Sequence, residues 1–433
     1  MARRKAPREI EVLIAGLDAD GRGVGEMWER TVRIKNALPG EQVRARVLKR
    51  RRGEWLGEAY EVERPHPCRQ RTPCEYYPRC GGCVLQHMRP GQQLLHKQGE
   101  VLACLESEGI AAAELLPPVS DAQFSYRTKA RLGVRVVGAN VMVGFRETLS
   151  NRVTRMTACL NLTPALSALI EPLRELVDAL SVRERIPQIE IAQGSSHRAI
   201  VVRHLDPLAE GDIRALVAFA RRNRIAVWSQ GGGPDTQTLL HGQELMTYQN
   251  ADFGLTLCFR PTEFTQVNEG INVKLVRHAV AALDVQAGDR VLDLFCGIGN
   301  FSLALARSGA TVVGVEGSDA AVRRARQNAG FNGVAGSCEF HLLDLYDAEP
   351  LKGMNANLLL VDPPRSGVGP LMEDWVTCDI RRIVYVSCNP RTFATDAKRL
   401  QVLGFSLRRI RVYDMFPNTA HVETMGVFDR SSV

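Results

Sequence analysis

The chain has 433 residues, of which 45% are hydrophobic, and it carries a formal net charge of +7. A single compact core rarely grows this large, so we expect about two to four globular domains. No stretch approaches the roughly 18 uninterrupted apolar residues of a membrane span, and the amino terminus lacks the apolar segment of a signal peptide. These features argue against an integral membrane protein and predict a cytoplasmic one.

Most of the net positive charge lies in residues 1–70, which hold 16 Lys and Arg against 11 Asp and Glu. From Ile10 to about Glu63, apolar and polar residues alternate between glycine turns, a pattern typical of short antiparallel strands that close into a small β-barrel. Four consecutive basic residues, 49–52, precede Trp55. Because basic side chains neutralise phosphates and aromatic rings stack on bases, this run indicates binding to single-stranded RNA, although a solvated hairpin explains it equally well.

Eleven cysteines, an odd number, argue against a disulfide framework in a cytosolic chain and favour metal binding or catalysis. Cys68, Cys74, Cys80 and Cys83 fall in a segment that is rich in proline and glycine and shows no helix or strand periodicity. A thiolate-bound metal centre would hold such a loop together without a hydrophobic core. By themselves, these four cysteines would complete a tetrahedral zinc site.

Further along the chain, the pattern predicts a helix at 92–108 and strands at 129–145, followed by further strands and helices of a sheet domain that runs to about residue 258. From about residue 260 helices and strands alternate. This order predicts a mostly parallel sheet that binds its ligands at the carboxyl ends of the strands.

A glycine turn opens this last region. A strand containing Asp293 leads into Gly297 and Gly299, which allow the backbone to approach a ligand closely. A dinucleotide fingerprint would have a third glycine where Ser302 stands and no acid within the strand, so NAD is disfavoured. Glu316 closes the next apolar strand, where a carboxylate can accept hydrogen bonds from both hydroxyls of a ribose. The pattern is similar to the first motif of class I S-adenosylmethionine methyltransferases.

Two later strands end in polar motifs, Asp362-Pro-Pro-Arg365 and Ser387-Cys-Asn-Pro390, which should meet the cofactor along the same sheet edge. Carbon 5 of uracil is too weak a nucleophile to take a methyl group unaided, but a thiolate added to carbon 6 makes it electron-rich. Cys388 is the candidate nucleophile, and Glu423 is the candidate base that removes the hydrogen at carbon 5. Taken singly, they would be interpreted as a buried structural thiol and a surface acid.

Together with residues 264–268, 293–301 and 421–425, these motifs resemble the RNA uracil-5 methyltransferase family over nearly the whole chain. The barrel and the cysteine loop are similar to those of family members that modify 23S ribosomal RNA rather than transfer RNA. The resemblance implies an α/β fold with a carboxyl-terminal Rossmann-like class I methyltransferase domain (259–433). It also implies an amino-terminal OB-like TRAM barrel (1–66) and an α+β central domain with an iron-sulfur loop (67–258).

The resemblance also implies roles for individual residues, with Cys388 as the nucleophile and Glu423 as the base. It implies contacts with S-adenosylmethionine at six positions: Gln266, Phe295, Asn300, Glu316, Asp344 and Asp362. It implies a [4Fe-4S] cluster held by Cys74, Cys80, Cys83 and Cys159. Cys68 competes with Cys159 for the fourth position if the centre is instead the compact zinc site.

The expected reaction is methylation of carbon 5 of a specific uridine in 23S ribosomal RNA by a monomeric enzyme. The target base must be extruded from a helix or already single-stranded, because carbon 5 is inaccessible in a stack. One alternative keeps the chemistry and changes the substrate to transfer RNA or another ribosomal uridine. A second is a non-catalytic RNA-binding protein stapled by its cluster, which would leave Cys388, Asp362 and the glycine turn without a purpose.

Overall fold

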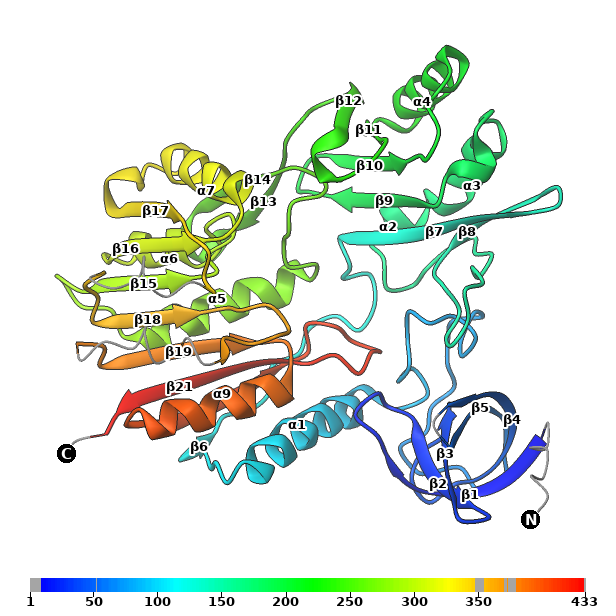
Figure 1. The fold of residues 1–433 in the computed structure, drawn as a ribbon, viewed down its shortest axis with the longest axis horizontal. Coiled ribbons are helices and arrows are strands. Elements are labelled where there is room, and N and C mark those ends of the chain that lie inside the picture. The colour runs from blue at the N-terminus through cyan, green and yellow to red at the C-terminus, as the bar shows by residue number, and fades with distance from the viewer. Residues whose placement is uncertain (1–8, 52, 347–353, 370–371, 373–378, 432–433) are drawn as a thin grey trace.

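A computed structural model describes residues 9–51, 53–346, 354–369, 372 and 379–431 of the protein. In these residues the strands form a closed barrel, a six-stranded sheet, a two-stranded sheet and an eight-stranded sheet (Figure 1). No helix within the described ranges has both the length and the apolar character that crossing a membrane requires.

The amino-terminal strands close into the small barrel that the alternating pattern predicts. In β1 the even positions from Ile10 to Ile14 point into the barrel and the odd ones face solvent, because alternate side chains of a barrel strand fill its interior. The guanidinium of Arg50 lies 5.9 Å from the centre of the Trp55 ring, while Arg52 of the basic run lies outside the described residues. The strands follow the barrel in the order β1-β2-β3-β5-β4, with bounds β1 (Glu9–Leu17), β2 (Gly23–Met27), β3 (Arg30–Lys35), β5 (Glu54–Val62) and β4 (Gln42–Arg51).

The middle of the chain forms a six-stranded mixed sheet with helices packed against it (Figure 1). Its core is aliphatic and includes Leu132, Ile191 and Val202. In spatial order the strands are β12 (Gln237–His241), β11 (Ala226–Gln230), β10 (Arg198–Arg203), β9 (Gln188–Gln193), β7 (Lys129–Val137) and β8 (Asn140–Gly144). The accompanying helices are α2 (Pro164–Ser167), α3 (Ile170–Asp178) and α4 (Glu210–Asn223), and the separate two-stranded sheet is β13 (Met246–Asn250) with β14 (Leu255–Phe259).

The eight-stranded sheet carries the candidate site, and its first five strands are parallel, as the βαβ order predicts. β21 then pairs antiparallel with both β19 and β20, and β6 is parallel to β20. In spatial order the strands are β17 (Cys338–Leu342), β16 (Thr311–Glu316), β15 (Arg290–Leu294), β18 (Leu358–Val361), β19 (Arg382–Ser387), β21 (Glu423–Arg430), β20 (Phe405–Tyr413) and β6 (Glu114–Leu115).

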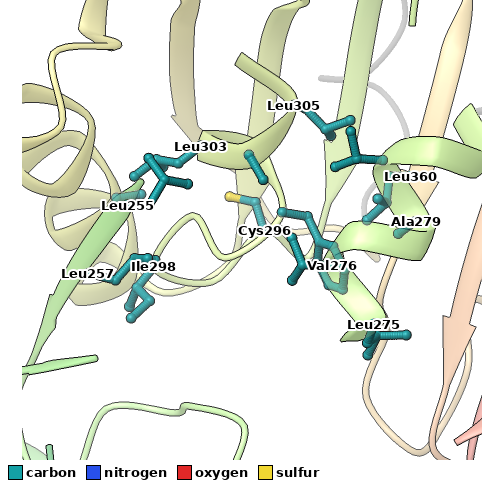
Figure 2. Close-up of a cluster of buried hydrophobic side chains, with 14 of the residues drawn as sticks. Leu255, Leu257, Leu275, Val276, Ala279, Cys296, Ile298, Leu303, Leu305 and Leu360 are labelled. Atoms are coloured by element: carbon teal, nitrogen blue, oxygen red, sulfur yellow. The ribbon is translucent and has the colours of Figure 1, made fainter. Parts of the chain in front are cut away.

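Both faces of this sheet are buried, because alternate residues of its strands enter two different apolar clusters. One face packs against α5 (Glu269–Leu283), α6 (Ser302–Arg307) and α7 (Asp319–Phe331). Figure 2 shows part of this cluster, in which Leu255 and Leu257 lie beside Ile298 and Leu303. Through these contacts β14 packs against the glycine turn and the start of α6. The other face packs against α1 (Pro90–Ser107) and α9 (Pro390–Val402).

α1 and β6 come from a part of the chain before the six-stranded sheet, yet they pack with the eight-stranded one. Leu94, Val101 and Leu105 of α1 enter its core, and α1 contacts α9 (Figure 1). Residues 90–115 thus connect the cysteine loop to the sheet that carries Cys388. The domain boundaries expected from sequence, 1–66, 67–258 and 259–433, stay predictions.

Candidate active site and cysteine cavity

The sheet register brings the candidate nucleophile and base together. Ser387, the last residue of β19, pairs with Thr424 of β21, so the neighbouring residues Cys388 and Glu423 stand opposite each other at the end of the two strands. Cys388 is half-buried, and Glu423 is only 2% exposed. The end of β18, on the other side of β19, adds Asp362 to the same sheet edge.

The surroundings of Cys388 favour a protonated thiol in the free protein. Burial raises the pKa of Cys388 to about 11, and the negative charges of Glu423 and Asp362 act in the same direction. Arg365 opposes them with its positive charge and a hydrogen bond to the thiol. Because its guanidinium also donates to Nδ1 of His421 at 2.7 Å, that ring nitrogen must be an unprotonated acceptor. The positive charge of Arg365 thus lowers the pKa of the Cys388 thiol and favours its ionised form.

Glu423 lies in an environment that makes it a strong base once it is ionised. Its pKa is raised well above the ordinary value by burial and then by the charge of Asp362, while Arg365 lowers it. A carboxylate with a raised pKa binds a proton more tightly than an exposed one. This property suits a group that has to remove a proton from carbon.

The glycine turn between β15 and α6 has the tight geometry that its sequence predicts. Gly297 and Gly299 have φ values of 56° and 92°, in the region that favours glycine. A Cβ atom on Gly299 would lie 2.3 Å from Leu303 Cδ1, so a larger residue there would displace the Leu303 side chain. Beside Gly297 there is open space. The turn can therefore admit a ligand directly against its backbone.

Three carboxylates from neighbouring parallel strands surround this turn. Asp293 is fully buried; Ser302 donates to one of its oxygens, and the other, Oδ1, has no hydrogen-bond partner in the described residues. Glu316 accepts from the backbone N–H groups of Gly297 and Ser318, at 3.1 and 2.9 Å.

Burial raises the pKa of Asp293 to about 7, and that of Asp362 also to about 7, the latter with a contribution from Asp293. A buried acid with an unpaired oxygen calls for a polar or cationic partner. The acids and the open turn therefore fit a positively charged ligand.

Among the other predicted cofactor contacts, Asn300 lies in the same turn and already bonds within the protein. Asn300 exchanges two amide hydrogen bonds with Asn272 of α5, both 3.0 Å, and accepts one from the Tyr248 hydroxyl, also 3.0 Å. This arrangement holds the turn to α5 and β13. Neither Asn272 nor Tyr248 belongs to a motif, so no pattern in the sequence pointed to them.

Phe295, Asp344 and Gln266 complete the set. The Phe295 ring centre lies 6.1 Å from that of Tyr346, whose backbone N–H donates to the Asp344 carboxylate at 2.9 Å. Gln266 is half-buried in the segment between β14 and α5. Whether these three residues, with Asn300, Glu316 and Asp362, bind a cofactor stays a prediction.

Four cysteines line a cavity of about 570 Å³ that extends to Arg365 and His421 beside the candidate active site. They are the predicted set Cys74, Cys80, Cys83 and Cys159, with Cys68 outside the lining. Burial raises the pKa of Cys80 to about 11 and that of Cys83 to about 12. In the described residues, no three His, Cys, Asp or Glu side chains come close enough to form a site for a single metal ion. The structure therefore shows neither the zinc site nor the iron-sulfur loop expected from sequence.

Comparison with known proteins agrees with the motifs. A family model described as tRNA (Uracil-5-)-methyltransferase matches residues 242–431, and the TRAM domain matches residues 3–59. The chain is 44% identical, over 99% of both sequences, to 23S rRNA (uracil(1939)-C(5))-methyltransferase RlmD of Hahella chejuensis. The chain belongs to the RNA uracil-5 methyltransferase family. The family assignment and the TRAM prediction are thereby confirmed.

Further relatives and one solved structure extend this result. The RlmD protein of Nitrosospira multiformis is 41% identical, with 97% of this chain and 98% of the relative covered. The crystal structure of Pyrococcus abyssi tRNA (uracil-54, C5)-methyltransferase in complex with S-adenosyl-L-homocysteine aligns with a TM-score of 0.76. It covers 97% of this chain and 100% of that chain at 23% identity, so it supports the fold alone. The domain built on the eight-stranded sheet thus has the class I methyltransferase fold.

Proposed function

We propose that this protein transfers a methyl group from S-adenosylmethionine to carbon 5 of a uridine in 23S ribosomal RNA. The observation that carries the proposal is the pairing of Ser387 with Thr424 across β19 and β21, which brings the neighbouring residues Cys388 and Glu423 to the same end of the two strands, beside the acids that surround the glycine turn. A thiol and a carboxylate in this relation can add to and then release a pyrimidine. The full-length similarity to RlmD proteins supports ribosomal RNA as the substrate.

The first step belongs to Cys388, which must lose its proton to solvent. Arg365 favours the ionised form through its charge and hydrogen bond. The thiolate then forms a bond to carbon 6 of uracil, and the electrons of the carbon 5–carbon 6 double bond move into the ring as an enolate. Carbon 5 thereby becomes the nucleophile that the reaction needs.

When bound, S-adenosylmethionine would supply an activated methyl group on a positively charged sulfur, with neutral S-adenosylhomocysteine as the co-product. Asp293, Glu316 and Asp362 are the residues that would hold it, because their negative charges complement its cationic methionine end and their oxygens can accept hydrogen bonds from its ribose hydroxyls. Carbon 5 then carries both the new methyl group and its original hydrogen.

The last step belongs to Glu423. Its carboxylate removes the hydrogen at carbon 5 as a proton, the electrons of that bond restore the carbon 5–carbon 6 double bond, and the bond from carbon 6 to sulfur breaks. The products are 5-methyluridine, the Cys388 thiolate and a protonated Glu423.

A methyl-transfer assay tests the proposal. Unmodified 23S ribosomal RNA is incubated with the protein and labelled S-adenosylmethionine, and the RNA is digested to nucleosides. We expect the label in 5-methyluridine, at a single position when the RNA is mapped. Transfer RNA is the competing substrate, because the matching family model is described by that activity. Faster labelling of transfer RNA would make transfer RNA the substrate in place of ribosomal RNA. No labelled uridine in either RNA would refute the proposal.

Cofactor binding should depend on pH in a direction that the buried acids set. Because the pKa values of Asp293 and Asp362 are both raised to about 7 in the free protein, a cationic ligand binds the ionised form that exists above this pH. We expect the affinity for S-adenosylmethionine to fall about tenfold from pH 8 to pH 6. Titration calorimetry measures this, with S-adenosylhomocysteine, which lacks the charged sulfur, as the control. The same slope for both ligands would show that the acids do not sense the sulfonium.

We also propose a [4Fe-4S] cluster for the cysteine cavity. The four cysteines that line it include Cys159 and leave out Cys68, and buried thiols with raised pKa values need a cation to exist as thiolates. Such a cluster would supply thiolate bonds that fold the proline-rich loop.

Two substitutions test the ligand set. For protein purified without oxygen we expect Cys159→Ser to abolish the brown absorbance near 400 nm and the bound iron, because it removes one of four ligands. Cys68→Ser should leave both unchanged. If instead Cys68→Ser bleaches the protein and Cys159→Ser does not, the fourth ligand is Cys68.

A further inference from the structure

The segment that joins β20 to β21, residues 414–422, is mostly buried. Connections between strands normally run over the surface, where water satisfies their backbone groups. A buried connection must find those partners within the protein. The segment leads directly into Glu423, the first residue of β21, so the contacts that fix it also fix the candidate base.

Asn418 lies at the centre of this segment and is fully buried. Its φ of 68° is in the left-handed region, which asparagine tolerates better than most residues. Its backbone N–H donates to Gln93 Oε1 at 2.9 Å, and its side-chain oxygen accepts from the amides of Gln93 and Gln123 at 3.3 and 3.2 Å. Its side-chain nitrogen donates to the Gln123 carbonyl at 2.9 Å and to Asn161 Oδ1 at 3.1 Å. One amide thus ties three separate segments together.

Two routes lead from Asn418 to the cysteine loop. Its carbonyl accepts from the backbone N–H groups of Val84 and Leu85, at 2.9 and 3.0 Å, directly after Cys83. Asn161, which accepts from the Asn418 amide, donates from its own amide nitrogen to Cys83 Sγ at 3.2 Å. Buried networks whose members are all paired are rigid. A movement of the cysteine loop would therefore move Asn418.

Lys97 anchors the start of the same segment. It is fully buried on α1, and its ammonium donates to Asp414 Oδ1 at 2.6 Å and to the Phe416 carbonyl at 3.0 Å. Removing one partner of such a pair leaves a buried charge, which strongly destabilises a fold. Asn268 and Tyr126 also donate to this segment, at the carbonyls of Met415 and Pro417. Of the two side-chain anchors described here, the one at Asn418 is uncharged and therefore open to milder changes.

Glu423 follows this anchored segment in the chain, and its backbone pairs with Tyr413 of β20. Within the described part of the chain no hydrogen bond holds its carboxylate, which interacts with Asp362 and Arg365 only through charge. We infer that Asn418 is a positioning residue: by clamping residues 414–422 to the cysteine loop, it sets the place from which Glu423 acts. The inference rests on the proposed function, in which Glu423 removes the proton from carbon 5.

Asn418→Gly tests the inference, because glycine keeps the left-handed backbone and deletes only the amide. We expect methyl transfer to carbon 5 to continue and release from Cys388 to slow about tenfold or more, since small displacements of a catalytic group are costly. A covalent adduct between protein and methylated RNA should then accumulate on ordinary RNA. Gln123→Ala, which removes one donor from a half-buried side chain, should show the same effect to a smaller degree.

Asn36→Gly is the matched control. Asn36 is also a left-handed asparagine, with φ 59°, whose side chain bonds to Ala59 and Arg69 in and beside the barrel. It should give no adduct. A loss of turnover in Asn418→Gly and Gln123→Ala without adduct would overturn the inference, and so would an equal amount of adduct in Asn36→Gly.

A second measurement needs no RNA and no turnover. Glu423 contributes to the raised pKa of Cys388, so a displaced Glu423 lowers that pKa. Alkylation of Cys388 by iodoacetamide, followed in its own peptide by mass spectrometry, should shift to lower pH in Asn418→Gly relative to the wild type. An unchanged profile contradicts the positioning role. If the wild-type protein failed to methylate uracil, the proposed function would be refuted. The alkylation measurement would still test whether Asn418 positions Glu423, because it requires no methyl transfer.

Discussion

Cys388→Ala is expected to abolish methylation, with turnover at least about 10⁴-fold below that of the wild type, because carbon 5 of uracil has no other route to becoming a nucleophile. Initial rates with labelled S-adenosylmethionine measure the loss. The half-buried position of Cys388 after β19 makes a folding defect a minor concern, since the substitution removes one sulfur atom at the open end of the strand. Binding of S-adenosylmethionine should be unchanged.

Cys104→Ala provides the control for this substitution. Cys104 is a half-buried cysteine on α1 that belongs to none of the motifs of the candidate site. Its loss should leave turnover at the wild-type rate. Turnover in Cys388→Ala comparable to that of Cys104→Ala would refute a thiol mechanism, and with it the role of Glu423.

Glu423→Gln is expected to trap the reaction halfway. The amide has the shape of the protonated carboxyl group that the raised pKa of Glu423 favours, so the fold should tolerate it. It cannot remove the proton from carbon 5, so the bond from carbon 6 to Cys388 should persist after methyl transfer. We expect turnover to fall about 10²- to 10⁴-fold, with labelled methyl groups in a protein–RNA adduct that survives a denaturing gel.

The amount of label in the adduct distinguishes this outcome from a general loss of activity. Label should accumulate in the adduct at up to one methyl group per protein molecule, because each molecule completes a single transfer. Normal turnover without any adduct would assign proton removal to another group, with Asp362 next to be tested because its charge acts on both Cys388 and Glu423.

Local patterns in the sequence predict much of the site. The alternation of residues 10–63 gives the barrel, and the glycine turn gives the left-handed residues Gly297 and Gly299 beside Asp293. These features depend on neighbours in the chain and on general rules for strands, turns and glycine. The expected parallel sheet follows in the same way, because helices and strands that alternate return each strand in the same direction.

Features that depend on contacts between distant parts of the chain could not be predicted from local sequence patterns. Cys388 and Glu423 face each other only because β21 enters the sheet between β19 and β20, an order that no local pattern encodes. α1 and β6 pack with a sheet whose strands begin far beyond them in sequence. Asn418 carried no signal at all, since an isolated asparagine in a loop is ordinary until its partners are known.

The most direct test of the central claim uses RNA that contains 5-fluorouridine at the target position, because fluorine at carbon 5 cannot be removed as a proton. With S-adenosylmethionine present, the wild-type protein should form a stable adduct that carries one methyl group. Mass spectrometry should place this adduct on the peptide that contains Cys388. No adduct, or an adduct on a different residue, would contradict covalent attack by Cys388 on the pyrimidine ring.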